Sequence, residues 1–162
     1  MRQVIHPPSR IEATVVPPGD KSISQRAVLL NSIAQGTAHV SNLCVGDDRA
    51  SMLRCLRGMG ARIRRHSACS ISGAQECFEV RGRGAYGLSE PASVLDAGNS
   101  ATTMRLVSGL LAAQPFMSVI TGDASLRRRP MKRILVPLER MGARITARQD
   151  GSLAPLVFEG GD

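Results

Sequence analysis

Apolar and polar positions follow the same pattern in two stretches of the chain. Residues 56–63 read Leu-Arg-Gly-Met-Gly-Ala-Arg-Ile, and residues 138–145 read Leu-Glu-Arg-Met-Gly-Ala-Arg-Ile. In both stretches an amphipathic segment with helical spacing ends at a glycine, which suits the left-handed position just past a helix, and an alternation typical of a strand follows. The repeat predicts that the chain contains two similar structural units.

The patterns on either side of this repeat predict the element order βαβαββ in both units. For the first unit they predict strands at 12–16, 38–43, 61–66 and 78–81 and helices at 22–35 and 48–59. For the second unit they predict strands at 94–97, 116–121, 143–148 and 155–159 and helices at 100–113 and 130–141. A stretch rich in Gly, Ser and Pro at 82–91 is expected to connect the units. The predicted fold class is therefore α/β (α+β).

Residues at the predicted helix ends support these boundaries. Ser22 and Gln25 form a capping-box pattern, and Asp47 or Asp48 can cap the second helix. Pro137 lies inside the predicted fourth helix, where it removes a backbone hydrogen bond. We expect a kink at this proline or a later start of the helix.

Composition narrows the class of partner. The chain is 43% hydrophobic and 21% charged, which is typical of a globular protein, and its net charge of +8 indicates an anionic partner. That partner can be nucleic acid, a membrane surface or a small phosphorylated or carboxylated substrate. One Tyr, three Phe and no Trp are too few for base-stacking platforms, which argues against nucleic acid. No apolar run is long enough to cross a bilayer and no signal segment is recognised, so we expect no membrane partner and a cytoplasmic location.

The cysteines do not suggest a metal site. Cys44, Cys55, Cys69 and Cys77 are spaced by 11, 14 and 8 residues and form no C-x-x-C pair of the kind found in zinc sites. We expect reduced thiols that serve mostly in packing. The alternative is a disulfide or a reactive thiol at any one of the four.

A polar segment at residues 17–26 joins a predicted strand to a predicted helix. It places Lys21, Ser22 and Arg26 at the helix start, where unpaired N–H groups and the helix dipole favour an anion. Arg26 lies one turn after Ser22 on the same face. The three side chains can together hold a carboxylate or a phosphate. Alternatively, Ser22 is only a cap and the two cations are solvated.

Two further segments have the same character. Residues 96–105 run from a strand through small residues into a helix, so a ligand can approach the backbone there, although Asn99 and Ser100 can also be simple caps. Residues 122–131 carry three consecutive arginines, at 127–129, directly before a helix that begins with a proline. Guanidinium groups bind phosphate oxygens bidentately, although a lone run of arginines is usually a solvated loop. Three such segments at corresponding places in a repeated unit favour an anion site.

These segments resemble the signature sequences of one enzyme family. Residues 19–27 (Gly-Asp-Lys-Ser-Ile-Ser-Gln-Arg-Ala), residues 98–102 (Gly-Asn-Ser-Ala-Thr) with Arg105, and the arginine-rich residues 122–131 are similar to motifs of the 5-enolpyruvylshikimate-3-phosphate (EPSP) synthases. The motifs span nearly the whole chain in the family's order. The related enolpyruvyl transferase of peptidoglycan synthesis lacks the Lys-Ser-x-Ser-x-Arg arrangement.

The resemblance implies a fold and an activity. The family fold is an inverse α/β barrel of two domains with three βαβαββ units each, so this chain would be an amino-terminal portion with two of six units, at about 19–83 and 92–162. Residues 1–18 would supply a strand to the other domain, and residues 19–162 would form a partial domain. The implied activity is that of a 3-phosphoshikimate 1-carboxyvinyltransferase, which transfers enolpyruvyl from phosphoenolpyruvate to shikimate 3-phosphate in aromatic amino acid (chorismate) biosynthesis. It uses no metal and no organic cofactor.

The resemblance also implies roles for individual residues. Lys21 would be catalytic and contact both substrates, and Ser22 and Arg26 would bind the shikimate moiety. Asn99, Ala101 and Arg129 would line the phosphoenolpyruvate site, with Arg129 on its phosphate.

Two departures from the family pattern carry further expectations. The family commonly has glycine at the position of Ala101, so the completed enzyme is expected to tolerate glyphosate. The chain stops before the family's carboxylates and its further lysine and arginines, so it is expected to be inactive without a carboxy-terminal fragment of the same enzyme. The alternative function is a basic nucleic-acid-binding module that uses the arginines at 127–129.

Overall fold

The computed structural model describes residues 3–4, 6–15, 17–67 and 76–161. The first half contains α1 (Lys21–Ile33), β1 (Gln35–Ser41), α2 (Asp47–Gly58), β2 (Arg62–His66) and β3 (Cys77–Arg83). The second half contains β4 (Leu95–Asp96), α3 (Ala101–Leu111), β5 (Ser118–Thr121), η1 (Leu126–Arg128), α4 (Lys132–Arg140), β6 (Ile145–Ala147), α5 (Arg148–Gly151) and β7 (Leu153–Phe158). In the part of the chain that is described, no helix is both long and apolar enough to span a membrane.

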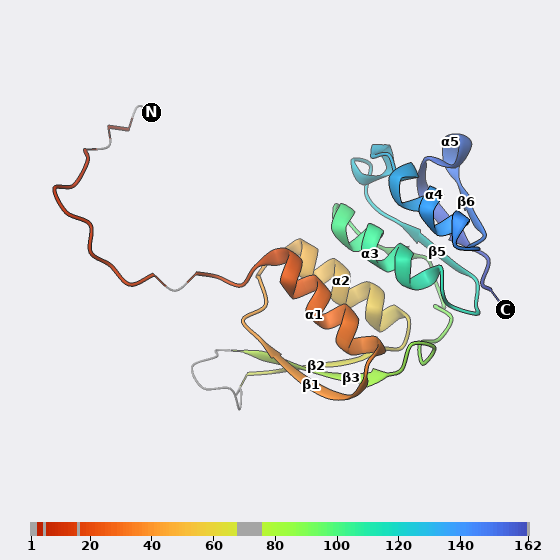
Figure 1. Cartoon of the computed structure of the whole chain (residues 1–162), viewed down its shortest axis with the longest axis horizontal. Coiled ribbons are helices and arrows are strands. Elements are labelled where there is room, and N and C mark those ends of the chain that lie inside the picture. Colours follow the sequence, from red (N-terminus) through yellow and green to blue (C-terminus); the bar gives the residue numbers. More distant parts are fainter. Residues whose placement is uncertain (1–2, 5, 16, 68–75, 162) are drawn as a thin grey trace.

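The first half is a three-stranded antiparallel sheet covered on one face by two helices. The strand order is β1-β3-β2, and α1 and α2 lie side by side on the same face of the sheet (Figure 1). Alternating side chains such as Ile63, Phe78 and Val80 are buried. Because successive strand residues point to opposite faces, Arg62, Arg64 and Arg81 lie on the face away from these buried residues.

The second half is a four-stranded sheet with α3 and α4. Its strand order is β4-β5-β7-β6; β4 and β5 are parallel, and the other pairs are antiparallel. Helix α3 contacts α1 and α2 on one side and β5 and α4 on the other (Figure 1). One core cluster spans both halves, with Met52 and Leu56 on α2, Met104 on α3, and Leu156 and Phe158 on β7. The start of α3 therefore lies close to the helices of the first half.

The predicted α/β class and nearly all the predicted elements are confirmed. Every predicted helix, and every strand from 38–43 onward, overlaps an observed element. The exception is the strand at 12–16: residues 12–15 are exposed and form no strand, and residue 16 lies outside the described residues. A strand needs a neighbour for its N–H and C=O groups, and this segment extends away from both sheets (Figure 1). The units at 19–83 and 92–162, and the assignment of residues 1–18 to another domain, stay predictions.

Two helix starts differ from the prediction. Helix α1 is capped by Asp20, whose Oδ1 accepts a hydrogen bond from the Ile23 amide at 2.7 Å, so Ser22 lies inside the first turn and is not the cap. Helix α2 follows Gly46 with no side-chain cap, and Asp48 lies in its first turn. An aspartate one position before the helix accepts one of the free amides of the first turn, so a cap at Ser22 is not needed.

Pro137 is accommodated inside α4. The helix begins at Lys132, later than the predicted residue 130, and it continues through the proline to Arg140. The later start was one of the two predicted outcomes. It leaves only one turn of helix before the proline, so few intrahelical hydrogen bonds are lost.

The cysteine prediction is only partly right. Cys44 and Cys55 are free thiols, and burial raises the pKa of Cys55 to about 12, which makes it an unreactive packing residue. Cys77 is disulfide-bonded, so the prediction of a reduced thiol is wrong for this residue. Cys69 lies outside the described residues.

Candidate functional site

The first two predicted anion-binding segments meet at Asp48. The Lys21 ammonium at the start of α1 lies 3.4 Å from Asp48 Oδ2, and the Ser100 hydroxyl at the start of α3 donates a hydrogen bond to Asp48 Oδ1. Ser100 also caps α3, because its Oγ accepts the Thr103 amide at 3.2 Å. One carboxylate on α2 therefore holds the lysine of the first segment beside the helix start of the second.

A buried amide strengthens this junction. Gln25 on α1 is 1% exposed, and its Nε2 donates to the Asp48 carbonyl at 3.1 Å, to Ser100 Oγ at 3.3 Å and to Thr103 Oγ1 at 2.9 Å. Its Oε1 is buried without a hydrogen-bond partner among the described residues, so only the nitrogen of this amide is paired. Hydrogen bonds in such a buried setting hold the elements that they join in place. The starts of α1, α2 and α3 are thus fixed relative to one another by side-chain hydrogen bonds.

The second and third segments meet at Asn99. The Arg129 guanidinium donates to Asn99 Oδ1 at 2.7 Å, and Asn99 Nδ2 donates to Asp123 Oδ2 at 2.7 Å. Asp123 Oδ1 also accepts the Leu126 amide at 2.7 Å. The hydrogen bonds from Asn99 and from Leu126 hold the pKa of Asp123 below its usual range, so this carboxylate stays ionised in mildly acidic solution.

The backbones of these two loops are in direct contact. The Asp123 amide donates to the Gly98 carbonyl at 2.9 Å. A Cβ at Gly122 would lie only 2.5 Å from the same carbonyl oxygen, so there is no room for a side chain between the loops. Gly122 therefore permits the close approach that brings Arg129 to Asn99.

The structure brings most of the predicted site residues together. Asp48 joins Lys21 to Ser100, and Asn99 binds Arg129. Because Asn99 and Ser100 are neighbours in the chain, these contacts form one connected group. Ala101 is the half-buried first residue of α3, two positions from Asn99.

The other predicted residues stand at the edge of this group. Arg26 is exposed, and its guanidinium turns back to the Ser22 carbonyl at 3.1 Å. Arg127 and Arg128 are exposed, and neither is hydrogen-bonded to the loop of Asn99. The roles assigned to Lys21, Ser22, Arg26, Asn99, Ala101 and Arg129 toward ligands stay predictions.

Three residues that organise the site were not predicted as site residues. Asp48 was expected only as a possible cap, Gln25 only as part of a capping box, and Asp123 only as part of a loop motif. Their roles depend on contacts between segments far apart in sequence, such as Asp48 with Ser100.

The site is suited to binding anions. Lys21 and Arg26 from the first segment and Arg129 from the third supply three cations. In the second segment, the Arg105 Nε is buried without a hydrogen-bond partner among the described residues. Charge-assisted hydrogen bonds from such groups bind phosphate and carboxylate strongly. Among all the residues that the structure describes, no group of three or more His, Cys, Asp or Glu is placed to hold a metal ion.

Comparison with known proteins identifies the family. Residues 5–162 match the model of the EPSP synthase (3-phosphoshikimate 1-carboxyvinyltransferase) family. The 3-phosphoshikimate 1-carboxyvinyltransferase of Alkaliphilus metalliredigens is 49% identical over 153 residues, which are 94% of this chain and 34% of that protein. The protein of the same name from Pelotomaculum thermopropionicum is 52% identical over 151 residues, which are 93% of this chain and 33% of that protein.

A solved structure agrees in fold. The EPSP synthase from Acinetobacter baumannii matches with a TM-score of 0.80 and 44% identity, over 89% of this chain and 31% of that one. The chain thus spans about a third of the length of these relatives. Its sequence motifs, its mixed α/β fold and these matches together place the chain in the EPSP synthase family.

Proposed function

We propose that this chain is the amino-terminal part of a 3-phosphoshikimate 1-carboxyvinyltransferase, which transfers the enolpyruvyl group from phosphoenolpyruvate to shikimate 3-phosphate. The observation that carries the proposal is the connected group from Lys21 through Asp48, Ser100 and Asn99 to Arg129. This group brings the three motif segments of the chain together and places their cations near one another. Both substrates are anions, and the net charge of +8 suits them.

In this proposal the residues of the chain bind and orient the two substrates. Lys21, held by Asp48, contacts both, while Ser22 and Arg26 bind the shikimate moiety. Arg129, held by Asn99, binds the phosphate of phosphoenolpyruvate beside Ala101. Anchored cations of this kind need no rearrangement when the substrates arrive, which lowers the barrier to reaction.

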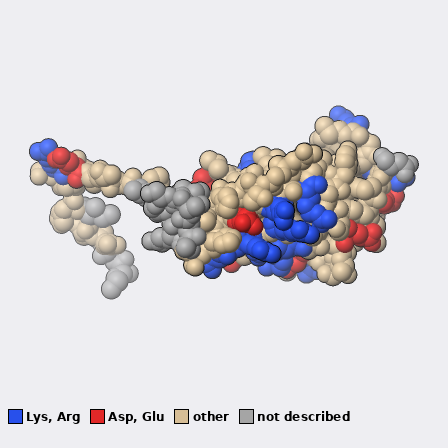
Figure 2. All heavy atoms as spheres, turned by 90° about the horizontal axis from the view of Figure 1, so that it is seen from below, with Lys and Arg blue, Asp and Glu red and all other residues tan. Residues whose placement is uncertain are grey.

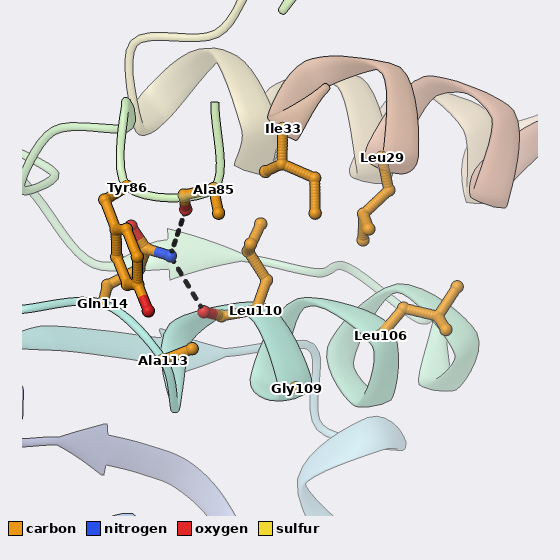
Figure 3. Close-up of a pocket in the computed structure, with 9 residues that line it drawn as sticks. All are labelled: Leu29, Ile33, Ala85, Tyr86, Leu106, Gly109, Leu110, Ala113 and Gln114. Atoms are coloured by element: carbon orange, nitrogen blue, oxygen red, sulfur yellow. Dashed lines mark hydrogen bonds between the residues drawn. The ribbon is translucent and has the colours of Figure 1, made fainter. Parts of the chain in front are cut away.

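An apolar groove on this chain supports the proposal that a second fragment of the enzyme packs against it. It lies between α1 and α3, has a volume of about 270 Å³, and is lined by Leu29 and Ile33 on α1 and by Leu106 and Leu110 on α3 (Figure 3). Leu30, also on α1, is 58% exposed. Since the chain spans only a third of its relatives, we propose that another segment of the same enzyme covers this groove.

Phosphate release tests the proposed function. This chain is incubated with phosphoenolpyruvate and shikimate 3-phosphate, alone and with the remaining two thirds of the Alkaliphilus metalliredigens relative. We expect release only in the mixture, because the proton-transferring groups that the family supplies elsewhere are needed. The mixture with Lys21→Met should be inactive. A stable, folded mixture that releases no phosphate would refute the proposal.

The completed enzyme is expected to tolerate glyphosate. Ala101 begins α3 within the proposed phosphoenolpyruvate site, and its methyl group reduces the space for an inhibitor larger than the substrate. Ala101→Gly should lower the inhibition constant for glyphosate roughly 10- to 100-fold while changing the KM for phosphoenolpyruvate much less. The comparison is made by steady-state inhibition of the active mixture. Equal inhibition constants for the two forms would contradict the expectation.

A further inference from the structure

The outer face of the β1-β3-β2 sheet carries a cluster of arginines that the proposed site does not use. Arg62 and Arg64 on β2 lie directly opposite Arg81 and Glu79 on β3. In Figure 2, which views the molecule from below, basic side chains gather in one cluster with an acidic group beside it. Arg62, Arg64, Arg81 and Glu79, which we call the arginine face, line a hollow of about 270 Å³.

The arginine face is separate from the proposed site. Helices α1 and α2, which carry Lys21 and Asp48, cover the other face of the same sheet (Figure 1). A ligand in the hollow therefore has the sheet between it and Lys21.

The guanidinium groups of this face are not neutralised within the protein. Among the described residues, Arg62, Arg64 and Arg81 form no ion pair or hydrogen bond through their side chains. The neighbouring Arg65 differs, because its Nε lies 2.6 Å from Glu76 Oε2. Like charges directly opposite in a sheet, as at Arg62 and Arg81, are unfavourable. The N–H donors of these three guanidinium groups are therefore free to bind an anion, and an anion would reduce the repulsion between them.

Size and charge select the kind of anion. Three guanidinium groups and one carboxylate leave an excess of two positive charges around a compact hollow rather than along an extended groove. Arginine forks pair with the oxygens of a phosphate group bidentately. Among the described residues, the strand register places the imidazoles of His39 and His66 on this face but no Phe, Tyr or Trp, since Phe78 is buried on the other side of the sheet. The large rings on which bases usually stack are therefore missing from the described part of this face.

We propose that the arginine face binds a small anion with two adjacent phosphate groups, independently of the enolpyruvyl-transfer site. Arg62 and Arg81 hold one phosphate between the strands, and Arg64 reaches the second. Glu79 accepts a hydrogen bond from a protonated phosphate oxygen and disfavours ligands with a single charge.

Calorimetric titration of the chain with pyrophosphate at fixed ionic strength tests the proposal. We expect saturable binding and a rise in Tm, because a ligand that binds only the folded state stabilises it. Arg62→Gln/Arg81→Gln should weaken binding at least about 10-fold. It should also raise the Tm of the free chain, since the opposed charges are gone.

A matched variant and two further titrations make the test specific. Arg133→Gln/Arg140→Gln removes the same charge from exposed positions on α4 and should leave pyrophosphate binding unchanged. An equal loss in both double variants would show binding to net charge only and would overturn the proposal. A loss of pyrophosphate binding in Arg129→Gln alone would also overturn the proposal, because it would place the anion in the enolpyruvyl-transfer site. Tighter binding of single-stranded RNA than of pyrophosphate, abolished by Arg62→Gln/Arg81→Gln, would overturn it in favour of a nucleic-acid surface.

Discussion

Gly122→Ala is expected to lower the free energy of unfolding by about 1–3 kcal/mol, the usual cost of overpacking. The added Cβ would lie 2.5 Å from the Gly98 carbonyl oxygen and 2.5 Å from Leu126 Cδ2. Neither atom can move freely, because the Gly98 carbonyl accepts the Asp123 amide and Leu126 is fully buried. The two loops must separate, which also weakens the contact between Arg129 and Asn99. Urea denaturation followed by circular dichroism measures the loss.

Gly109→Ala is the matched control. Gly109 lies inside α3, and no atom beyond its own helix lies within 4 Å of the position that a Cβ would take. Alanine there removes the entropic cost of a helical glycine, so the free energy of unfolding should rise by about 0.5–1 kcal/mol. The same stability for Gly122→Ala and the unmodified chain would contradict the close approach of the two loops.

Arg129→Gln is expected to reduce kcat/KM for phosphoenolpyruvate on the order of 100-fold in the completed enzyme. Asn99 Oδ1 at 2.7 Å and Ser125 Oγ at 3.4 Å accept hydrogen bonds from Arg129 Nη2, which orients the guanidinium and leaves its Nε and Nη1 donors for a phosphate. Glutamine keeps a polar side chain but loses the charge and the fork of donors. Initial rates of phosphate release at varied phosphoenolpyruvate concentration measure the effect.

The adjacent Arg127 offers a control for this substitution. It is exposed and has no side-chain hydrogen bond to the described residues, so Arg127→Gln removes the same charge without touching Asn99. We expect its kcat/KM to change less than about threefold, as for screened surface charges. If both substitutions reduced kcat/KM equally, the general charge of the loop rather than the position of Arg129 would account for phosphoenolpyruvate binding. Thermal denaturation of both variants excludes a loss of fold.

Local pattern was sufficient for most of the secondary structure. The period of the apolar residues placed α1 to α4 and β1 to β7 within a few residues of their observed bounds, since these elements bury one face and expose the other. Helix ends were less well predicted. Asp20 and Ser22 are both good caps, and the choice between them depends on the path of the chain before α1.

The strand at 12–16 shows where local pattern is insufficient. Its alternation is typical of a strand, but a strand forms only where another strand completes its hydrogen bonds, and residues 12–15 have none beside them. The disulfide at Cys77 is a similar case, because the pairing of cysteines depends on distance in space.

Local sequence was enough to specify the helices and strands of the two sheets and the three polar segments that carry Lys21, Asn99 and Arg129, because periodicity, small residues and charge act over a few neighbouring positions. Three contacts required the folded chain: Asp48 joins Lys21 to Ser100, Gly122 lets two loops touch, and Arg62 and Arg81 lie opposite one another on two strands. These contacts link residues far apart in the chain, and they form only when the packing of α1, α2 and α3 and the register of β2 and β3 bring those residues together.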